Sequence, residues 1–190
     1  MITSYQTIRE RIKTGDILEW QSKSIIGSAI RFITKQEVNH TSLCIDLQQY
    51  LHWLEPHKFV LEANAPGIEL NLISRELGEY KGGHCWWYKL KDIYNDKRNY
   101  IANSALLQVG KKYDYNSLFK NIISRANAEA NNYFCSEFAF IELVKENIIS
   151  GLHFNYTKQI VLDIKDEPVK APRPGEFGQF GIFENPIQII

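Results

Sequence analysis

The chain has 190 residues, and its 22 basic and 22 acidic side chains give a formal net charge of zero. Hydrophobic residues make up 44% of the chain and charged residues 23%, which is ordinary for a globular protein with a sizeable core. The balanced charge gives no reason to expect a nucleic-acid partner. The sequence contains no run of about 18 apolar residues, so we expect no integral membrane segment. We therefore expect one domain over residues 1–190, and its oligomeric state stays open.

The N-terminal segment and the cysteines bear on the compartment. The first residues, MITSYQTIRERIKTGD, lack the apolar stretch of a secretory signal peptide. Cys44, Cys85 and Cys135 form an odd, widely spaced set, which gives neither a disulfide framework nor a paired metal-binding motif. Free thiols in a reducing compartment, the cytoplasm, are the simplest expectation, although release from the cell without a signal stays open.

Helical and strand patterns alternate in the first half of the chain. Tyr5, Ile8 and Ile12 have helical spacing, so we expect a helix over residues 4–13 that ends at Gly15. Apolar spacing predicts a further helix over residues 22–34. The segments expected as strands are GDILEW (15–20), NHTSLCIDL (39–47), KFVLEAN (58–64) and GHCWWYKL (83–90).

The second half of the chain is expected to be mainly helical until its tail. A helix over residues 97–110 is stopped by Gly110, and a turn with one short helix follows over residues 111–132. A helix that carries Cys135 comes next, and QIVLDI (159–164) is expected as a strand before a loop with prolines and glycines. Strands in the middle of the chain with helices before and after them indicate an α+β fold with a mostly antiparallel sheet.

Cys135 lies where the helix of NNYFCSEFAFIELVKENII (131–149) is expected to begin. A catalytic cysteine reacts as the thiolate, and the unpaired N–H groups of a helix N-terminus favour the thiolate and can hold an oxyanion. A free cysteine on its own is more often a small buried core residue, so a catalytic assignment needs a histidine. The apolar face is expected to contain Phe134, Phe138, Ile141, Val144 and Ile148, and the opposite face Glu142 and Glu146.

His40 is the histidine best placed to act with a cysteine. It opens the expected strand HTSLCI, and a strand end that faces a helix N-terminus can hold an imidazole rigidly beside a thiol. The other histidines, expected to be surface or hydrogen-bonded side chains, are His52, His57, His84 and His153.

Glu62 is the candidate that would orient the imidazole of His40. It lies within the strand KFVLEAN, where a carboxylate is uncommon unless it faces solvent or has a partner. The connecting loop centres near residue 51, so a simple antiparallel pairing places His40 and Glu62 nearly opposite each other. The alternatives are a solvated Glu62 on an edge strand, or a slip by one residue, which would move Glu62 to the other face.

The segments GDILEW, NHTSLCI, FVLEAN, KYDYNSLF and YFCSEFAF, in that order, resemble the circularly permuted NlpC/P60 proteins of the YiiX/YebB-like type. These proteins are a branch of the papain-like cysteine hydrolases. The resemblance extends from about Gly15 to the RPGEF segment near Pro174. It implies a papain-like fold in permuted order, with the histidine strand before the cysteine helix and an antiparallel sheet packed against that helix.

The resemblance also carries the family's site residues onto this chain. Its nucleophile falls on Cys135, its histidine on His40 and its acidic partner on Glu62. Thr41 departs from the small or valine residue that is frequent after the histidine, a mild change that should leave the chemistry intact.

The family's YD motif falls on Tyr113 and Asp114, so Tyr113, or the nearby Tyr115, is expected to line the substrate pocket or help hold the oxyanion. The expected function is that of a cysteine peptidase or amidase. It would cleave a peptide or cell-wall-peptide-like amide through a thioacyl intermediate, with a small peptide or acyl-containing substrate and no metal or organic cofactor.

Other functions stay open. One is a lipid-directed acyl hydrolase or acyltransferase that uses the same triad and an aromatic acyl groove. Trp86 and Trp87 are adjacent on a strand and point to opposite faces, so at most one of them lines a given cleft. Another is a non-catalytic binding module that keeps the fold. A zinc site at His84 and Cys85 lacks a second paired ligand at the usual spacing.

Overall fold

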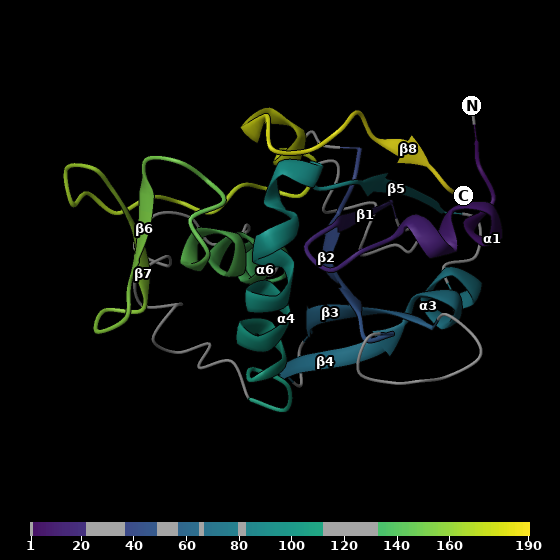
Figure 1. Cartoon of the computed structure of the whole chain (residues 1–190), viewed down its shortest axis with the longest axis horizontal. Helices are drawn as coiled ribbons and strands as arrows, with labels where there is room; N and C mark the ends of the chain where they lie inside the picture. Colours follow the sequence, from purple (N-terminus) through teal and green to yellow (C-terminus); the bar gives the residue numbers. More distant parts are fainter. Residues whose placement is uncertain (1, 22–36, 49–56, 65–66, 80–82, 112–132) are drawn as a thin grey trace.

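The computed structural model describes residues 2–21, 37–48, 57–64, 67–79, 83–111 and 133–190. The helix expected over residues 22–34 lies outside these ranges, as does the segment 112–132 with Tyr113 and Tyr115. Within the described ranges the chain forms a large sheet with helices packed around it (Figure 1).

Six strands of the described chain form one sheet in the order β4-β3-β2-β1-β5-β8, and each neighbouring pair is antiparallel. These strands are β1 (Ile17–Gln21), β2 (His40–Asp46), β3 (Lys58–Asn64), β4 (Gly67–Leu72), β5 (His84–Tyr88) and β8 (Ile187–Gln188). A separate antiparallel pair consists of β6 (Leu152–Asn155) and β7 (Ile160–Asp163). The fold is therefore α+β with a mostly antiparallel sheet, as expected, although the sequence patterns did not predict β4, β6 or β8.

The helices of the described chain are α1 (Tyr5–Ile8), α3 (Ile73–Glu79), α4 (Arg98–Leu106) and α6 (Tyr133–Lys145), with 3-10 turns η1 (Arg9–Arg11), η2 (Asp92–Lys97) and η4 (Phe177–Phe180). The helix expected over residues 4–13 is thus divided between α1 and η1, and α3 was not predicted from the sequence. Among the described residues, no helix combines the length and apolarity that a membrane crossing requires.

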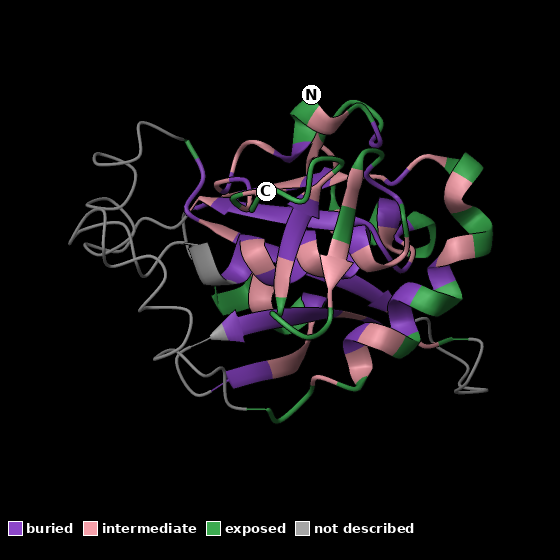
Figure 2. Ribbon diagram, turned by 90° about the vertical axis from the view of Figure 1, so that its left-hand side faces the viewer, coloured by how far each residue is buried: buried purple, intermediate pink, exposed green. Residues whose placement is uncertain are grey.

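The alternation of side chains along the strands divides the core into two layers. On one face of the sheet, Ile17, Leu43 and Leu61 pack with residues of α4 and α6. On the other face, Leu18 and Val60 pack with residues of α1 and α3. Figure 1 shows α4 and α6 on one side of β2 and α1 and α3 on the other, and in Figure 2 the strands of the large sheet are mainly buried.

α6 is buried on most of its sides, which corrects one expectation. Glu142 does not lie on a solvent-exposed face: it is only 1% exposed, and Lys145 Nζ donates to its Oε1 at 2.7 Å. Phe138 and Val144 are buried as expected, whereas Ile148 is buried beyond the end of the helix. The reason is that α6 contacts both the large sheet and β6, so two surfaces cover it.

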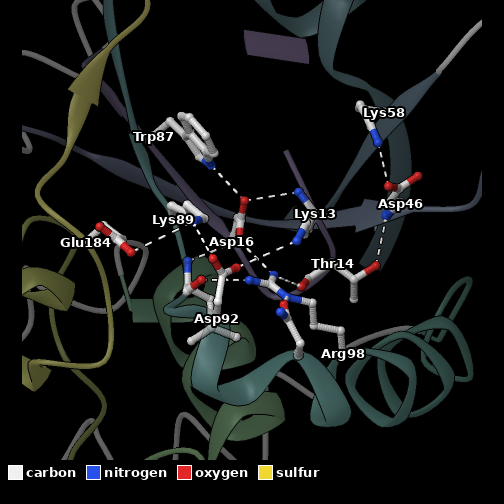
Figure 3. A network of polar contacts seen from close by, with 12 residues as sticks. Lys13, Thr14, Asp16, Asp46, Lys58, Trp87, Lys89, Asp92, Arg98 and Glu184 are labelled. Atoms are coloured by element: carbon white, nitrogen blue, oxygen red, sulfur yellow. Dashed lines mark hydrogen bonds and ion pairs between the residues drawn. The ribbon is translucent and has the colours of Figure 1, made fainter. Parts of the chain in front are cut away.

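A buried ion pair joins the start of β1 to α4. Asp16 is fully buried, and its Oδ1 accepts hydrogen bonds from Arg98 Nη1 at 2.9 Å and from the Leu90 backbone N–H at 3.1 Å. Its Oδ2 accepts from Trp87 Nε1 at 2.8 Å and from the Lys13 backbone N–H at 3.0 Å (Figure 3). Both oxygens are satisfied, so Asp16 ties three separate segments together around one carboxylate.

The turn after α4 pairs with the outer strand β4. The helix ends at Leu106, earlier than the stop expected at Gly110, and Gly110 has a φ of 77°, which glycine adopts without strain. The Gly110 N–H donates to the Ile68 carbonyl at 2.9 Å, and the Ile68 N–H donates to the Lys111 carbonyl at 3.2 Å. The backbone of β4 is therefore hydrogen-bonded on both of its sides at this position.

Candidate active site

His40 and Glu62 meet between neighbouring strands. Nε2 of His40, the first residue of β2, lies 2.9 Å from Oε1 of Glu62 in β3. Leu43 pairs with Leu61, a register that sets Glu62 opposite Ser42 rather than opposite His40 as expected. This displacement by two residues keeps His40 and Glu62 on one face of the sheet, so the contact forms even though the expected pairing was not the one observed.

The carboxylate of Glu62 has donors at both oxygens. Besides the contact with His40, the Ser42 hydroxyl donates to Oε1, and Asn71 Nδ2, from β4, donates to Oε2 at 3.3 Å. Glu62 is 4% exposed, and β3 lies between β2 and β4 in the sheet. The alternative of a solvated Glu62 on an edge strand is therefore wrong.

Trp20 continues this set of contacts into the core. Its Nε1 donates to the Ser42 hydroxyl oxygen at 2.8 Å, and the residue pairs with His40 across β1 and β2. Sequence reasoning missed Ser42 and Asn71. The position of Ser42, two residues after His40 in one strand, was an available signal because such residues share a face.

Cys135 reaches His40 from the start of α6. It is the third residue of that helix, 5% exposed, and its side chain forms a hydrogen bond with the His40 side chain. α6 packs against β2 and β3, the strands that carry His40 and Glu62. The structure thus brings the three residues expected for a triad into one connected set of contacts.

The contacts displace two pKa values in opposite directions. Burial alone would lower the pKa of His40, but a neighbouring Cys135 thiolate and the Glu62 carboxylate raise that pKa well above its ordinary value. Burial raises the pKa of Glu62, but the hydrogen bonds and charge of His40, with those of Ser42 and Asn71, outweigh it and lower the pKa. A charged His40 beside a charged Glu62 is therefore the favoured state of the pair.

Glu76 in α3 is a further acidic group close to the pair. Burial, followed by the negative charges of Glu62 and Glu79, raises the pKa of Glu76 above its ordinary value. The two other cysteines lie in the core beneath the α1 and α3 side of the sheet, and burial raises the pKa of the Cys44 and Cys85 thiols.

The remaining candidates have other partners or lie outside the described chain. His84 Nδ1 lies 3.3 Å from the Ile190 carbonyl oxygen, and His153 Nε2 lies 3.2 Å from Asp166 Oδ1 near the surface. His52, Tyr113 and Tyr115 lie outside the described residues, so the two tyrosines remain candidates from the sequence alone. In the described ranges, no group of three or more His, Cys, Asp or Glu side chains is arranged to hold a metal ion.

Comparison with known families identifies the family of the chain. The profile of the permuted papain-like amidases of the YaeF/YiiX type, the C92 peptidase family, matches residues 11–170. The chain belongs to this family. Membership supports a cysteine-type hydrolase, and the match contains Cys135, His40 and Glu62 within its bounds.

A solved structure shares the fold. The crystal structure of the metalloprotein yiiX from Escherichia coli O157:H7 superposes with a TM-score of 0.52 at 19% sequence identity. The match covers 70% of this chain and 66% of that one, so this chain spans slightly less than two thirds of the length of its neighbour. A comparison with curated proteins finds no match.

Proposed function

We propose that this protein is a cysteine amidase in which Cys135 is the nucleophile, His40 the general acid and base, and Glu62 the residue that orients His40. The observation that carries the proposal is the continuous set of contacts from Glu62 through His40 to Cys135, with 2.9 Å between Glu62 Oε1 and His40 Nε2. Membership in the permuted papain-like amidases supports the same chemistry.

The raised pKa of His40 supplies the starting state. His40 takes the proton of the Cys135 thiol, which gives a thiolate beside an imidazolium that Glu62 stabilises. The thiolate then attacks the carbonyl carbon of the substrate amide, and the imidazolium donates its proton to the leaving amine as the C–N bond breaks. A thioacyl enzyme remains, and His40 accepts a proton from the water that hydrolyses it.

The start of α6 supports stabilisation of the oxyanion. α6 begins at Tyr133, so the backbone N–H of Cys135 belongs to the first turn, whose N–H groups have no partner within the helix. Such a donor can hold the oxyanion that develops beside Sγ. Tyr113, with Tyr115 as its alternative, stays a proposal from the sequence for the second donor or for the pocket wall.

The substrate class follows from the family rather than from a ligand. We propose a small peptide or cell-wall-peptide-like amide, acted on in a reducing compartment, the cytoplasm, where the three cysteines stay free. Hydrolysis and transfer to another acceptor use the same thioacyl intermediate, so acyl transfer remains the alternative outcome. Trp87 is not available to line the acyl groove that a lipid enzyme would need, because it is buried and its Nε1 donates a hydrogen bond to Asp16.

The first experiment is alkylation of the three cysteines by iodoacetamide at several pH values, followed by mass spectrometry. We expect Cys135 to react faster than Cys44 and Cys85 at about pH 6, where an ordinary thiol with a pKa of about 8.5 is almost entirely protonated. His40→Ala should remove this advantage. Equal, slow reaction of all three cysteines, with no effect of His40→Ala, would favour the non-catalytic binding module.

The second experiment measures turnover of a peptide library and of acyl esters, with and without an amine acceptor. We expect amide cleavage that Cys135→Ala reduces at least about 1,000-fold, as removal of a nucleophile does in comparable triads. Activity that survives Cys135→Ala would refute the assignment. Cleavage restricted to long-chain esters would instead support the lipid-directed alternative.

A further inference from the structure

We infer that Ser42, itself oriented by Trp20, is a positioning residue that fixes which ring nitrogen of His40 carries the hydrogen. The inference rests on the proposed function, because it concerns how His40 is prepared to act on Cys135. Neither Ser42 nor Trp20 belongs to the triad expected from the sequence. Trp20 lies in β1, the strand next to that of His40, and Ser42 lies in β2 with His40. Both side chains are buried.

The direction of these hydrogen bonds begins at Trp20. An indole N–H is a donor and never an acceptor, so the 2.8 Å contact between Trp20 Nε1 and Ser42 Oγ is a bond in which Ser42 accepts. The hydroxyl hydrogen of Ser42 must therefore be directed to a different acceptor. The structure offers Oε1 of Glu62, which Ser42 Oγ contacts directly.

The same direction continues through Glu62 to the imidazole. An ionised carboxylate only accepts hydrogen bonds, and Glu62 already accepts from Ser42 at Oε1 and from Asn71 at Oε2. The hydrogen in the 2.9 Å contact between Glu62 Oε1 and His40 Nε2 then belongs to His40. A neutral His40 with its hydrogen on Nε2 has its lone pair on Nδ1, which is the nitrogen left to take a proton from Cys135.

Removal of the Ser42 hydroxyl should weaken this preference. Glu62 would keep only one neutral donor, Asn71, and its own protonation would become easier, which would let it donate to His40 instead. The charged groups around the pair set the background for any pH measurement. The charged or titratable groups that face the pair are Cys135 on α6, Glu69 opposite Glu62 on β4 and Glu76 on α3, whereas the thiol of Cys85 on β5 is neutral.

Thr41 provides a matched control one residue away. Its side chain is also a fully buried hydroxyl in β2, but it points to the other face of the sheet, and its Oγ1 has no hydrogen-bond partner within the described chain. Thr41→Val removes a buried hydroxyl without touching Glu62, while Ser42→Ala removes the one that Glu62 accepts from. Ser42→Thr retains the hydroxyl and tests for rescue.

The experiment compares the pH profile of Cys135 alkylation in the wild type, Ser42→Ala, Ser42→Thr, Thr41→Val and His40→Ala. We expect Ser42→Ala to lower the rate at about pH 6 roughly fivefold to tenfold, the effect of losing one hydrogen bond of ordinary net strength. Thr41→Val should match the wild type, and Ser42→Thr should regain most of the loss. Equal profiles for Ser42→Ala and Thr41→Val would overturn the inference while the His40→Ala result still tests the proposed function.

A second measurement tests the same point by determining the tautomer of His40 directly. In Cys135→Ala protein labelled with ¹⁵N-histidine, two-bond ¹H–¹⁵N correlation spectra at high pH report the tautomer of His40, which comparison with the double variant Cys135→Ala/His40→Ala identifies. We expect the hydrogen on Nε2, and the form with hydrogen on Nδ1 to appear when Ser42→Ala is added. A ring with its hydrogen on Nδ1 while Ser42 is intact would overturn the inference.

Discussion

Glu62 and Asp16 are both buried carboxylates with hydrogen-bond donors at each oxygen, but they contact different kinds of cationic side chain. Asp16 faces the guanidinium of Arg98, which stays charged at any accessible pH. Its other donors are the Trp87 indole and the backbone N–H groups of Leu90 and Lys13. Glu62 faces His40, whose side chain is 20% exposed and also contacts Cys135. The first arrangement is closed and serves the fold, whereas the second ends at a group that can exchange a proton.

The comparison teaches that satisfaction of a buried carboxylate does not identify its role. Both carboxylates fulfil the usual requirement that buried polar atoms find partners. The distinguishing features are a titratable partner and a route from that partner to a nucleophile. Substitutions at the two carboxylates should therefore separate stability from reactivity.

Asp16→Ala should have the largest effect, and on stability alone. It leaves the buried Arg98 guanidinium and the Trp87 N–H without their acceptor, and breaking a buried ion pair from one side costs about 3–5 kcal/mol. Urea unfolding followed by circular dichroism measures this loss. In the fraction that remains folded, Cys135 should be alkylated at the wild-type rate, and a slower rate would mean that the two regions are coupled.

Glu62→Gln should have the next largest effect, and mainly on activity. An amide has the shape of the carboxylate but no charge, so it no longer stabilises the imidazolium, and we expect kcat/KM to fall about 100-fold. The amide that replaces the carboxylate also carries N–H donors, and a bond donated from it to His40 would favour the wrong tautomer. An unchanged kcat/KM would exclude Glu62 from the site.

Glu62→Gln should also change how the free energy of unfolding depends on pH. The lowered pKa of Glu62 adds stability above the ordinary value of about 4.3, and this is lost as pH falls through the lowered pKa. The raised pKa of His40 adds stability below about 6.5, which is lost as pH rises through the raised pKa. The unfolding free energies of wild type and Glu62→Gln should thus differ most between about pH 5 and 6.5.

Glu19 extends the comparison to a carboxylate that is only half satisfied, with the smallest expected effect. The Gly175 N–H donates to Oε1 at 2.7 Å, but buried Oε2 has no partner among the described residues, and burial raises the pKa of Glu19 to about 7. An acid with a raised pKa loses stability as pH rises from about 4.5 to 7, so Glu19→Gln should gain about 2.5 kcal/mol relative to wild type over that interval. Thermal unfolding at pH values on both sides of the interval measures this, and a constant difference would contradict it.

The sequence predicted the parts of the fold and site that depend on local pattern. β1, β2, β3, β5 and β7 follow from strand-forming residues, and the contact of His40 with Glu62 was expected from the loop between their strands. The expected register was displaced by two residues, an error that period-two alternation tolerates because it keeps the face. A displacement by one would have separated the pair.

The missed features depend partly on tertiary packing and partly on a local alternation that the predicted elements left out. Glu142 was expected at the surface because helical periodicity assumes one exposed side, and α6 is covered on two. Asn71 lies in β4, whose apolar alternation at Ile68, Leu70 and Leu72 was present in the sequence but not used. Ser42 could have been placed on the face of His40 from its position two residues further along the strand, but its hydrogen bonds with Trp20 and Glu62 depend on how three strands pair.

The turn at Gly110 has a consequence for behaviour at high concentration. An outer strand with free N–H and C=O groups is a template on which a second chain can add a strand, and such addition begins many aggregates. At β4 the backbone of Ile68 is already engaged by Gly110 and Lys111, and at the opposite edge β8 is only two residues long. Among the described residues, the margin at β8 therefore offers little length for intermolecular β-pairing, and the margin at β4 is occupied at Ile68. A side chain at Gly110 that disfavours its left-handed conformation would free the backbone of Ile68.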